Sequence, residues 1–144
     1  MDGVLTDFER GFKKATGKSI EEYEAEHGKN SFWSEIDRIG YKFWSELEWM
    51  PEGEKLWSYI KSKNVPIEIL TSPSRDYSSR VGKKIWVKEN LGDSIIVNFS
   101  WHKSSFSKPG NVLIDDYTKH QEKWIKKGGI FILYTGFNNL ASEL

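Results

Sequence analysis

Three groups of polar side chains in this chain are associated with short apolar segments. Asp2 lies in the N-terminal segment, Thr71-Ser72 follow the run 67–70, and Asp115-Asp116 follow the run 112–114. In an open parallel sheet, such groups collect in the crevice at the carboxyl ends of the strands. Magnesium-dependent phosphoryl transfer requires carboxylates that bind the metal and hydroxyls that bind phosphate oxygens. The pattern therefore predicts a phosphoryl-transfer site at one edge of a sheet.

Each group also has a purely structural explanation. Ser and Thr residues after a strand often cap the next helix, and Ser74 or Asp76 could take that role here as well as Thr71. Asp115-Asp116 could likewise cap a helix that begins near Thr118. Two adjacent carboxylates at the tip of a buried strand repel each other unless a cation offsets their charge. The three groups together, in this order along the chain, indicate a phosphoryl-transfer site more specifically than any one of them.

The elements that must hold these groups are apolar runs that alternate with amphipathic stretches after residue 64. Helices are expected at about 76–91 and 118–127, the second ending at Gly128-Gly129. Strands are expected at Val65–Leu70, Ser94–Asn98, Val112–Ile114 and Ile130–Tyr134. This alternation predicts an α/β fold in which helices cover a parallel sheet.

Residues 8–63 have a helical pattern with almost no strand signal. Phe32, Ile36, Ile39 and Phe43 are spaced by four, three and four residues, which predicts an amphipathic helix with an aromatic face. Pro51 separates this stretch from a second helix that includes residues 56–60. Most of the aromatic stripe is expected to pack in the core.

The composition is that of an ordinary globular domain. The 144 residues include no cysteine, so disulfides, thiolate metal sites and cysteine nucleophiles are excluded. No apolar run approaches the roughly 20 residues of a membrane span and no signal peptide is visible, so we expect a cytoplasmic protein. The formal charge is zero, and no nucleic acid polymer or membrane is expected as a partner. His27, His102 and His120 lack metal-ligand spacing and are expected at the surface.

Longer motifs around the polar groups point to a known family. The segment Met1–Asp7 resembles the first motif of the haloacid dehalogenase (HAD) phosphatases, Asp-x-Asp-Gly-Val-x-x-Asp, beginning with its second residue. Ile69–Ser74 resembles the second motif of the 5′(3′)-deoxyribonucleotidase branch, and Val112–Asp116 resembles the fourth. Lys103 stands where that branch has its third-motif lysine, with Lys108 as the alternative.

The resemblance implies a Rossmann-like HAD fold, with a parallel sheet flanked by helices and a small helical cap inserted after the first strand. Residues 1–144 would form one domain, with a core of residues 1–7 and about 50–144 and a cap of about 8–49. The first strand, at about Met1–Leu5, would be central in the sheet. Asp7 would have a structural role at the entry to the cap.

The resemblance also implies a role for each site residue. Asp2 would be the general acid and base, and Thr71 with the Ser72 amide would bind phosphate oxygens. Lys103 would neutralise charge on the phosphate and the aspartates. The residues expected to hold Mg²⁺ are Asp2 through its carbonyl, Asp115 directly and Asp116 as a supporting group.

Aromatic residues of the cap could also bind the substrate, because relatives in this family stack cap aromatics on a nucleobase. Stacking of this kind contributes about 1–3 kcal/mol per base. The residues considered for it are Phe32, Trp33, Phe43 and Trp44.

The predicted function is magnesium-dependent hydrolysis of phosphomonoesters, with (deoxy)nucleoside monophosphates as the expected substrates, through an aspartyl-phosphate intermediate. The family's nucleophile would immediately precede Met1, so the 144-residue chain itself is expected to have activity near background. The alternative is a catalytically inactive protein that binds a nucleotide or a partner. A third hypothesis is a phosphatase for small phosphomonoesters in general. The sequence does not indicate the oligomeric state.

Overall fold

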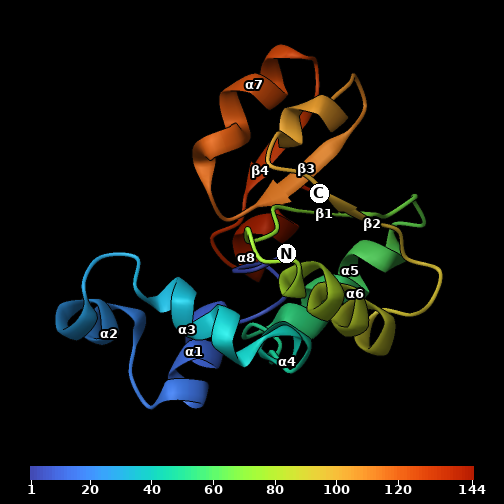
Figure 1. The fold of residues 1–144 in the computed structure, drawn as a ribbon. Helices are drawn as coiled ribbons and strands as arrows, with labels where there is room; N and C mark the ends of the chain where they lie inside the picture. Colours follow the sequence, from blue (N-terminus) through green and yellow to red (C-terminus); the bar gives the residue numbers. More distant parts are fainter.

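The computed structural model describes residues 1–144 and has a mixed α/β fold (Figure 1). The α-helices are α1 (Phe8–Thr16), α2 (Ile20–His27), α3 (Phe32–Ile39), α4 (Tyr41–Ser45), α5 (Gly53–Ser62), α6 (Ser78–Asn90), α7 (Gln121–Lys126) and α8 (Phe137–Ala141). The strands are β1 (Ile69–Thr71), β2 (Val97–Phe99), β3 (Val112–Asp115) and β4 (Ile130–Leu133). The 3-10 helices are η1 (Lys103–Phe106) and η2 (Thr118–His120). The strands and helices after residue 64 therefore follow the expected order, and the α/β class is confirmed.

The strands form two separate parallel pairs. Strand β1 pairs with β2, with Thr71 opposite Phe99, and β3 pairs with β4, with Asp115 opposite Leu133. The expected parallel direction is thus present, but the pairs are not joined into one sheet. Both Thr71 and Asp115 are the last residues of their strands.

The N-terminal residues form a turn, so the prediction of a strand at Met1–Leu5 was wrong. The carbonyl oxygen of Met1 accepts the backbone N–H groups of Val4 at 3.2 Å, Leu5 at 2.8 Å and Thr6 at 3.2 Å. Gly3 makes this reversal feasible because its φ is 76°, in the left-handed region that side chains disfavour. A chain folded back on itself in this way has no extended backbone to pair with a neighbouring strand.

The region 8–49 expected to form the cap contains α1–α4. The predicted aromatic stripe does not form one helix, because Gly40 separates α3 from α4. Ile36 and Phe43, from the two parts of the stripe, are both buried. Asp7 caps α1 by accepting the N–H of Arg10 at 3.1 Å, as its expected structural role requires.

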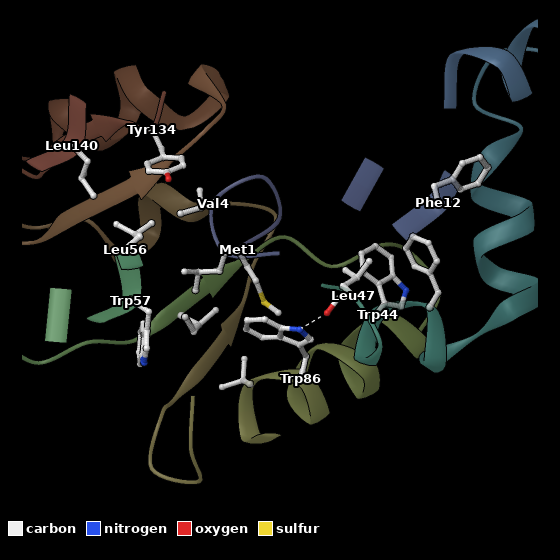
Figure 2. Packing of buried hydrophobic residues seen from close by; sticks show 14 of the residues in the cluster. Met1, Val4, Phe12, Trp44, Leu47, Leu56, Trp57, Trp86, Tyr134 and Leu140 are labelled. Atoms are coloured by element: carbon white, nitrogen blue, oxygen red, sulfur yellow. Dashed lines mark hydrogen bonds between the residues drawn. The ribbon is translucent and has the colours of Figure 1, made fainter. Parts of the chain in front are cut away.

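Helix α4 packs closely against α6. A Cβ at Gly82 would overlap the carbonyl oxygen of Tyr41 and the Cβ of Trp44, so only glycine permits this approach. The indole N–H of Trp86, on α6, donates to the carbonyl oxygen of Leu47 at 2.8 Å (Figure 2). Helix α6 is thereby held against the helical region on one side and against β2 on the other.

One hydrophobic cluster of 16 buried residues joins the helical region to the strands. Met1 and Val4 lie in it between Trp86 on one side and Tyr134 and Leu140 on the other (Figure 2). The N-terminal turn is therefore part of the core. None of the helices has the combination of length and apolar character needed to cross a bilayer.

Candidate functional site

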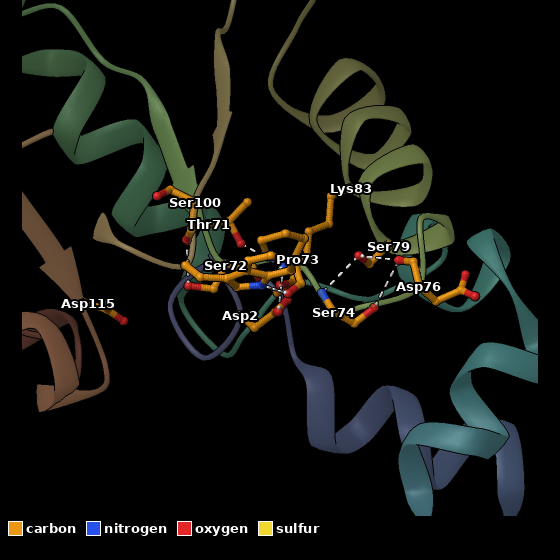
Figure 3. A network of polar contacts seen from close by, with 12 residues as sticks. Asp2, Thr71, Ser72, Pro73, Ser74, Asp76, Ser79, Lys83, Ser100 and Asp115 are labelled. Atoms are coloured by element: carbon orange, nitrogen blue, oxygen red, sulfur yellow. Dashed lines mark hydrogen bonds and ion pairs between the residues drawn. The ribbon is translucent and has the colours of Figure 1, made fainter. Parts of the chain in front are cut away.

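The carboxyl end of β1 forms one half of the candidate site, which we call the threonine half (Asp2, Thr71, Ser72 and Lys83). Lys83, on α6, is buried and donates to the Thr71 hydroxyl at 2.7 Å and to the Ser72 carbonyl oxygen at 2.9 Å. Its ammonium also pairs with Asp2 at 3.2 Å (Figure 3). One lysine thus links the strand end to the N-terminal turn.

The pKa values of this half reflect that buried ion pair. Burial favours the neutral form of Asp2, but Lys83 and the Thr6 hydroxyl, which donates at 2.7 Å, outweigh it and lower the pKa of Asp2. Burial lowers the pKa of Lys83, while the charge of Asp2 opposes that shift. Asp2 is therefore held as a carboxylate, with one oxygen on Lys83 and the other on Thr6.

The carboxyl end of β3 forms the other half, which we call the carboxylate half (Lys103, Asp115 and Asp116). Lys103 begins η1 and its ammonium lies 2.9 Å from Oδ2 of Asp115. Both side chains are buried. Burial opposes ionisation of Asp115, but the charge and hydrogen bond of Lys103 outweigh it and lower the pKa of Asp115.

Asp116 is not neutralised in the same way. Partial burial, the hydrogen bond with Asp115 and the negative charge of Asp115 raise the pKa of Asp116. Its carboxylate lies against the backbone of Gly3, where a Cβ would overlap it. The carboxylate half therefore contains two adjacent carboxylates and one lysine, next to the N-terminal turn.

The N-terminal turn lies between the two halves. Its α-amino group is buried, and burial together with the charge of Lys103 lowers the pKa of the Met1 amino group to about 6. Asp2 and Asp115, one from each half, act on it in the opposite direction. The halves are thus close enough to interact electrostatically.

The oxygen atoms of this site fit a hard divalent cation. Asp115 and Asp116 bring carboxylate oxygens together, and magnesium prefers oxygen ligands. Burial is the main cause of the raised pKa of Asp116, and the neighbouring charge of Asp115 adds to it, which a cation would offset. No group of three or more His, Cys, Asp or Glu side chains converges here or elsewhere. Any metal would therefore need backbone oxygens, water or substrate as further ligands.

The capping explanation holds for Asp76 but not for Thr71 or Asp115-Asp116. The Thr71 hydroxyl accepts a hydrogen bond from Lys83. The N-cap residue of α6, Tyr77, makes no capping hydrogen bond with its side chain. Asp76 accepts the N–H of Ser78 at 2.9 Å, which is the local role considered for it. No side-chain cap precedes η2, so Asp116 does not cap that helix. Thr71 and Asp115 both point into the candidate site.

The alternative lysine and the histidines are also resolved. Lys108 is exposed, whereas Lys103 pairs with Asp115, so Lys103 is the lysine of this site. His27 and His102 are exposed as expected. The expectation for His120 was wrong, because its side chain is buried, and burial and the charge of Lys103 lower its pKa.

Of the four aromatic residues considered for base stacking, two have no free ring surface. Phe43 and Trp44 are 5% and 1% exposed, and both pack against Phe8. Phe32 packs edge-on against Phe8 and Phe12, while Trp33 is 38% exposed. Stacking of the cap on a base stays a prediction, with Trp33 as its exposed member.

Lys83 is the site residue that the sequence reasoning missed. The sequence contains a signal for its burial. Lys83 shares a helix face with Ser79, Trp86 and Val87, which lie four, three and four residues away from it. All four side chains are buried. A lysine on the apolar face of an amphipathic helix requires a buried partner, and here it has three oxygens.

The chain matches no protein-family model and no curated protein.

Proposed function

We propose that this chain carries the site of a HAD-type magnesium-dependent phosphomonoester hydrolase that acts on (deoxy)nucleoside monophosphates. The observation that carries the proposal is the convergence of Thr71 and Lys83 with Asp2 on one side and of Lys103 with Asp115 on the other. These are the hydroxyl, cationic and carboxylate groups that phosphoryl transfer uses. They come from segments far apart in the sequence.

The arrangement of the strands is consistent with a Rossmann-like HAD core. The two parallel pairs would form one sheet, in the order β2-β1-x-β3-β4, if a further strand lay between β1 and β3. The N-terminal turn lies at that place, since Asp2 contacts Lys83 beside β1 and Gly3 contacts Asp116 after β3. Ligand sites in such sheets lie where the strand order reverses.

The residues of the site have distinct tasks in this proposal. The Thr71 hydroxyl and Lys103 bind the phosphate oxygens, while Lys83, whose three N–H groups face Thr71, Ser72 and Asp2, adds positive charge beside them. Asp2 must enter the first step protonated to deliver a proton to the leaving oxygen, and the carboxylate that results, which Lys83 stabilises, accepts a proton from the attacking water in the second step. Asp115 and Asp116 would hold Mg²⁺, which supplies further neutralisation of the phosphate when bound.

The test is phosphate release from deoxyuridine monophosphate in the presence of Mg²⁺. In the HAD motif the nucleophile stands immediately before the residue equivalent to Met1. A variant extended at its N-terminus by an apolar segment ending in Asp should therefore gain activity over the 144-residue chain. Within the extended variant, Asp2→Asn should lower kcat by about 10²–10⁴-fold.

The matched control is the same extension ending in Asn. It retains the length and the apolar residues but offers no nucleophile. Equal, background activity of the Asp and Asn extensions would overturn the hydrolase proposal. Activity of both would show that phosphoryl transfer does not use this nucleophile.

A second function, binding without catalysis, is favoured by the buried lysines. Lys83 and Lys103 are both fixed by contacts that need no nucleophile, so the site could hold a nucleotide phosphate as it stands. Calorimetry would then detect nucleotide binding, and the Asp extension would still give no turnover.

A further inference from the structure

A second group of aromatic side chains surrounds an arginine on the surface next to the threonine half. The guanidinium of Arg80, on α6, lies 6.0 Å from the ring centre of Tyr77, 5.7 Å from that of Phe99 and 5.6 Å from that of Trp101. Tyr77 is 70% exposed and Trp101 is 51% exposed. We call these four residues the arginine cluster.

The arginine cluster is joined directly to the loop after β1. The indole N–H of Trp101 donates to the carbonyl oxygen of Pro73 at 2.7 Å. The preceding residue, Ser100, donates its N–H to Thr71 at 3.1 Å and accepts the Ser72 hydroxyl at 3.0 Å. Trp101 is thus anchored one residue beyond the Ser72 carbonyl that holds Lys83, and successive Cα atoms are only about 3.8 Å apart.

We propose that the arginine cluster is a subsite for the base of a nucleoside monophosphate whose phosphate binds at Thr71 and Lys83. This inference rests on the proposed phosphate site. It assigns the base to the end of β2 and the start of α6, and not to the aromatic residues of the helical region.

The chemistry of the arginine cluster fits this ligand. A large exposed indole offers a ring face for stacking, and its hydrogen bond to Pro73 fixes the ring before the ligand arrives. Arg80 contacts ring faces and forms no ion pair with an acidic side chain, so its N–H groups can reach base carbonyl oxygens. The ammonium of Lys84, 5.9 Å from the ring centre of Phe99, adds positive charge that complements an anionic nucleotide.

The alternative position in the helical region offers less surface. Phe43 and Trp44 are buried among other aromatic rings, and exposing them would disrupt the core. The large exposed rings there are Tyr41, at 45%, and Trp33, at 38%, and only Trp33 carries an indole like that of Trp101. It therefore provides the matched comparison for Trp101.

The experiment is calorimetry of the 144-residue chain with Mg²⁺ and three probes: inorganic phosphate, ribose 5-phosphate and uridine monophosphate. The last two differ in the base. One stacked base should make uridine monophosphate bind about 5- to 150-fold more tightly than ribose 5-phosphate. Trp101→Ala should reduce this ratio to about twofold or less, with ribose 5-phosphate affinity retained, whereas Trp33→Ala should leave the ratio unchanged.

Two further variants keep the test decisive if Trp101→Ala does not fold. Trp101→Phe retains a ring and should keep part of the preference for uridine monophosphate over ribose 5-phosphate. Arg80→Gln removes the cation and should lower that preference. The base subsite would be overturned, and the phosphate site kept, by an affinity ratio of uridine monophosphate to ribose 5-phosphate near one in the parent chain. A ratio that is lost in Trp33→Ala and kept in Trp101→Ala would have the same meaning. Failure of all three probes to bind would overturn the phosphate site itself.

Discussion

The two halves of the site balance their charges differently. In the threonine half, Lys83 contacts three oxygens and faces one carboxylate, so its charges and hydrogen bonds are matched internally. In the carboxylate half, Lys103 faces Asp115 but Asp116 adds a second negative charge. The charges of the threonine half thus cancel, whereas the carboxylate half has one carboxylate more than it has lysines.

The difference separates preorganisation from ligand binding. A matched set of contacts holds side chains in place without a ligand, which is useful for groups that must receive phosphate oxygens in one geometry. An excess negative charge favours a cation, because binding relieves repulsion that the folded chain otherwise retains. The threonine half should therefore govern stability, and the carboxylate half should govern the response to metal.

The largest expected effect is the loss of the buried lysine in the threonine half. Lys83→Met should destabilise the fold by about 3–5 kcal/mol, because it leaves Asp2 and Thr71 without their buried partner. Urea unfolding followed by circular dichroism measures this. Lys88→Met, at an exposed position of the same helix, should stay within about 0.5 kcal/mol of the parent chain. Equal stability of the two variants would show that the threonine half is not a structural unit.

The stabilisation of the fold by Mg²⁺ should depend on the carboxylate half and not on the threonine half. At 100 times its Kd, Mg²⁺ should raise the free energy of unfolding by about 2.7 kcal/mol, because it binds the folded chain. Asp115→Asn should abolish this rise, whereas Thr71→Val, in the other half, should retain it. Thermal unfolding across a magnesium titration measures both. A rise that survives Asp115→Asn would place the metal elsewhere.

A smaller effect is expected where the helical region meets α6. Gly82→Ala should destabilise by about 1–3 kcal/mol, because the new Cβ overlaps Tyr41 and Trp44 and forces α6 outward. Since Lys83 follows Gly82, the variant should also weaken phosphate binding in the threonine half. Glu89→Ala, at an exposed position of α6, is the control for unfolding and for phosphate calorimetry. Destabilisation with unchanged phosphate binding would separate the packing of α6 from the position of its lysine.

The smallest effect is a dependence on acid pH. The lowered pKa of Asp2 stabilises the fold above the unfolded value of 3.8, and this contribution is lost as pH falls through the lower folded value. Asp115 behaves likewise, but the raised pKa of Asp116 makes protonation of the folded state easier, so acid relieves part of the strain there. Asp2→Asn should thus flatten the fall in Tm below about pH 4 more than Asp115→Asn does. The reverse order would assign the acid sensitivity to the carboxylate half.

The sequence predicted the elements and residues whose signals are local. Apolar runs ending in polar residues located β1 and β3, and with them Thr71 and Asp115. The end of a strand can be predicted in this way because its signal lies in a few adjacent residues. The N-terminal turn could not be found in this way. Its conformation depends on contacts with Trp49 and Met50, far along the chain, which replace strand pairing.

Long-range packing also explains what was missed in the site. The helix face of Lys83 indicated that the lysine is buried, but its partners lie on a different strand and in the N-terminal turn, which the sequence does not show. The single sheet was expected from alternation alone, which predicts strand direction but not whether separate pairs join. Residue types thus predicted most of the candidate site residues, and the packing of α6 determines how they are arranged.

The hydrogen bond from the Trp86 indole to Leu47 has a consequence for motion. Swinging the helical region α1–α4 away from the strands would break that bond and expose the rings of Trp44 and Trp86 to water, at a cost of about 25 cal/mol per Å² of apolar surface. Such an opening would be rare at equilibrium. Substrates should therefore enter through movements of side chains at the rim, in nanoseconds, and not through a slow hinge between the helical region and the strands.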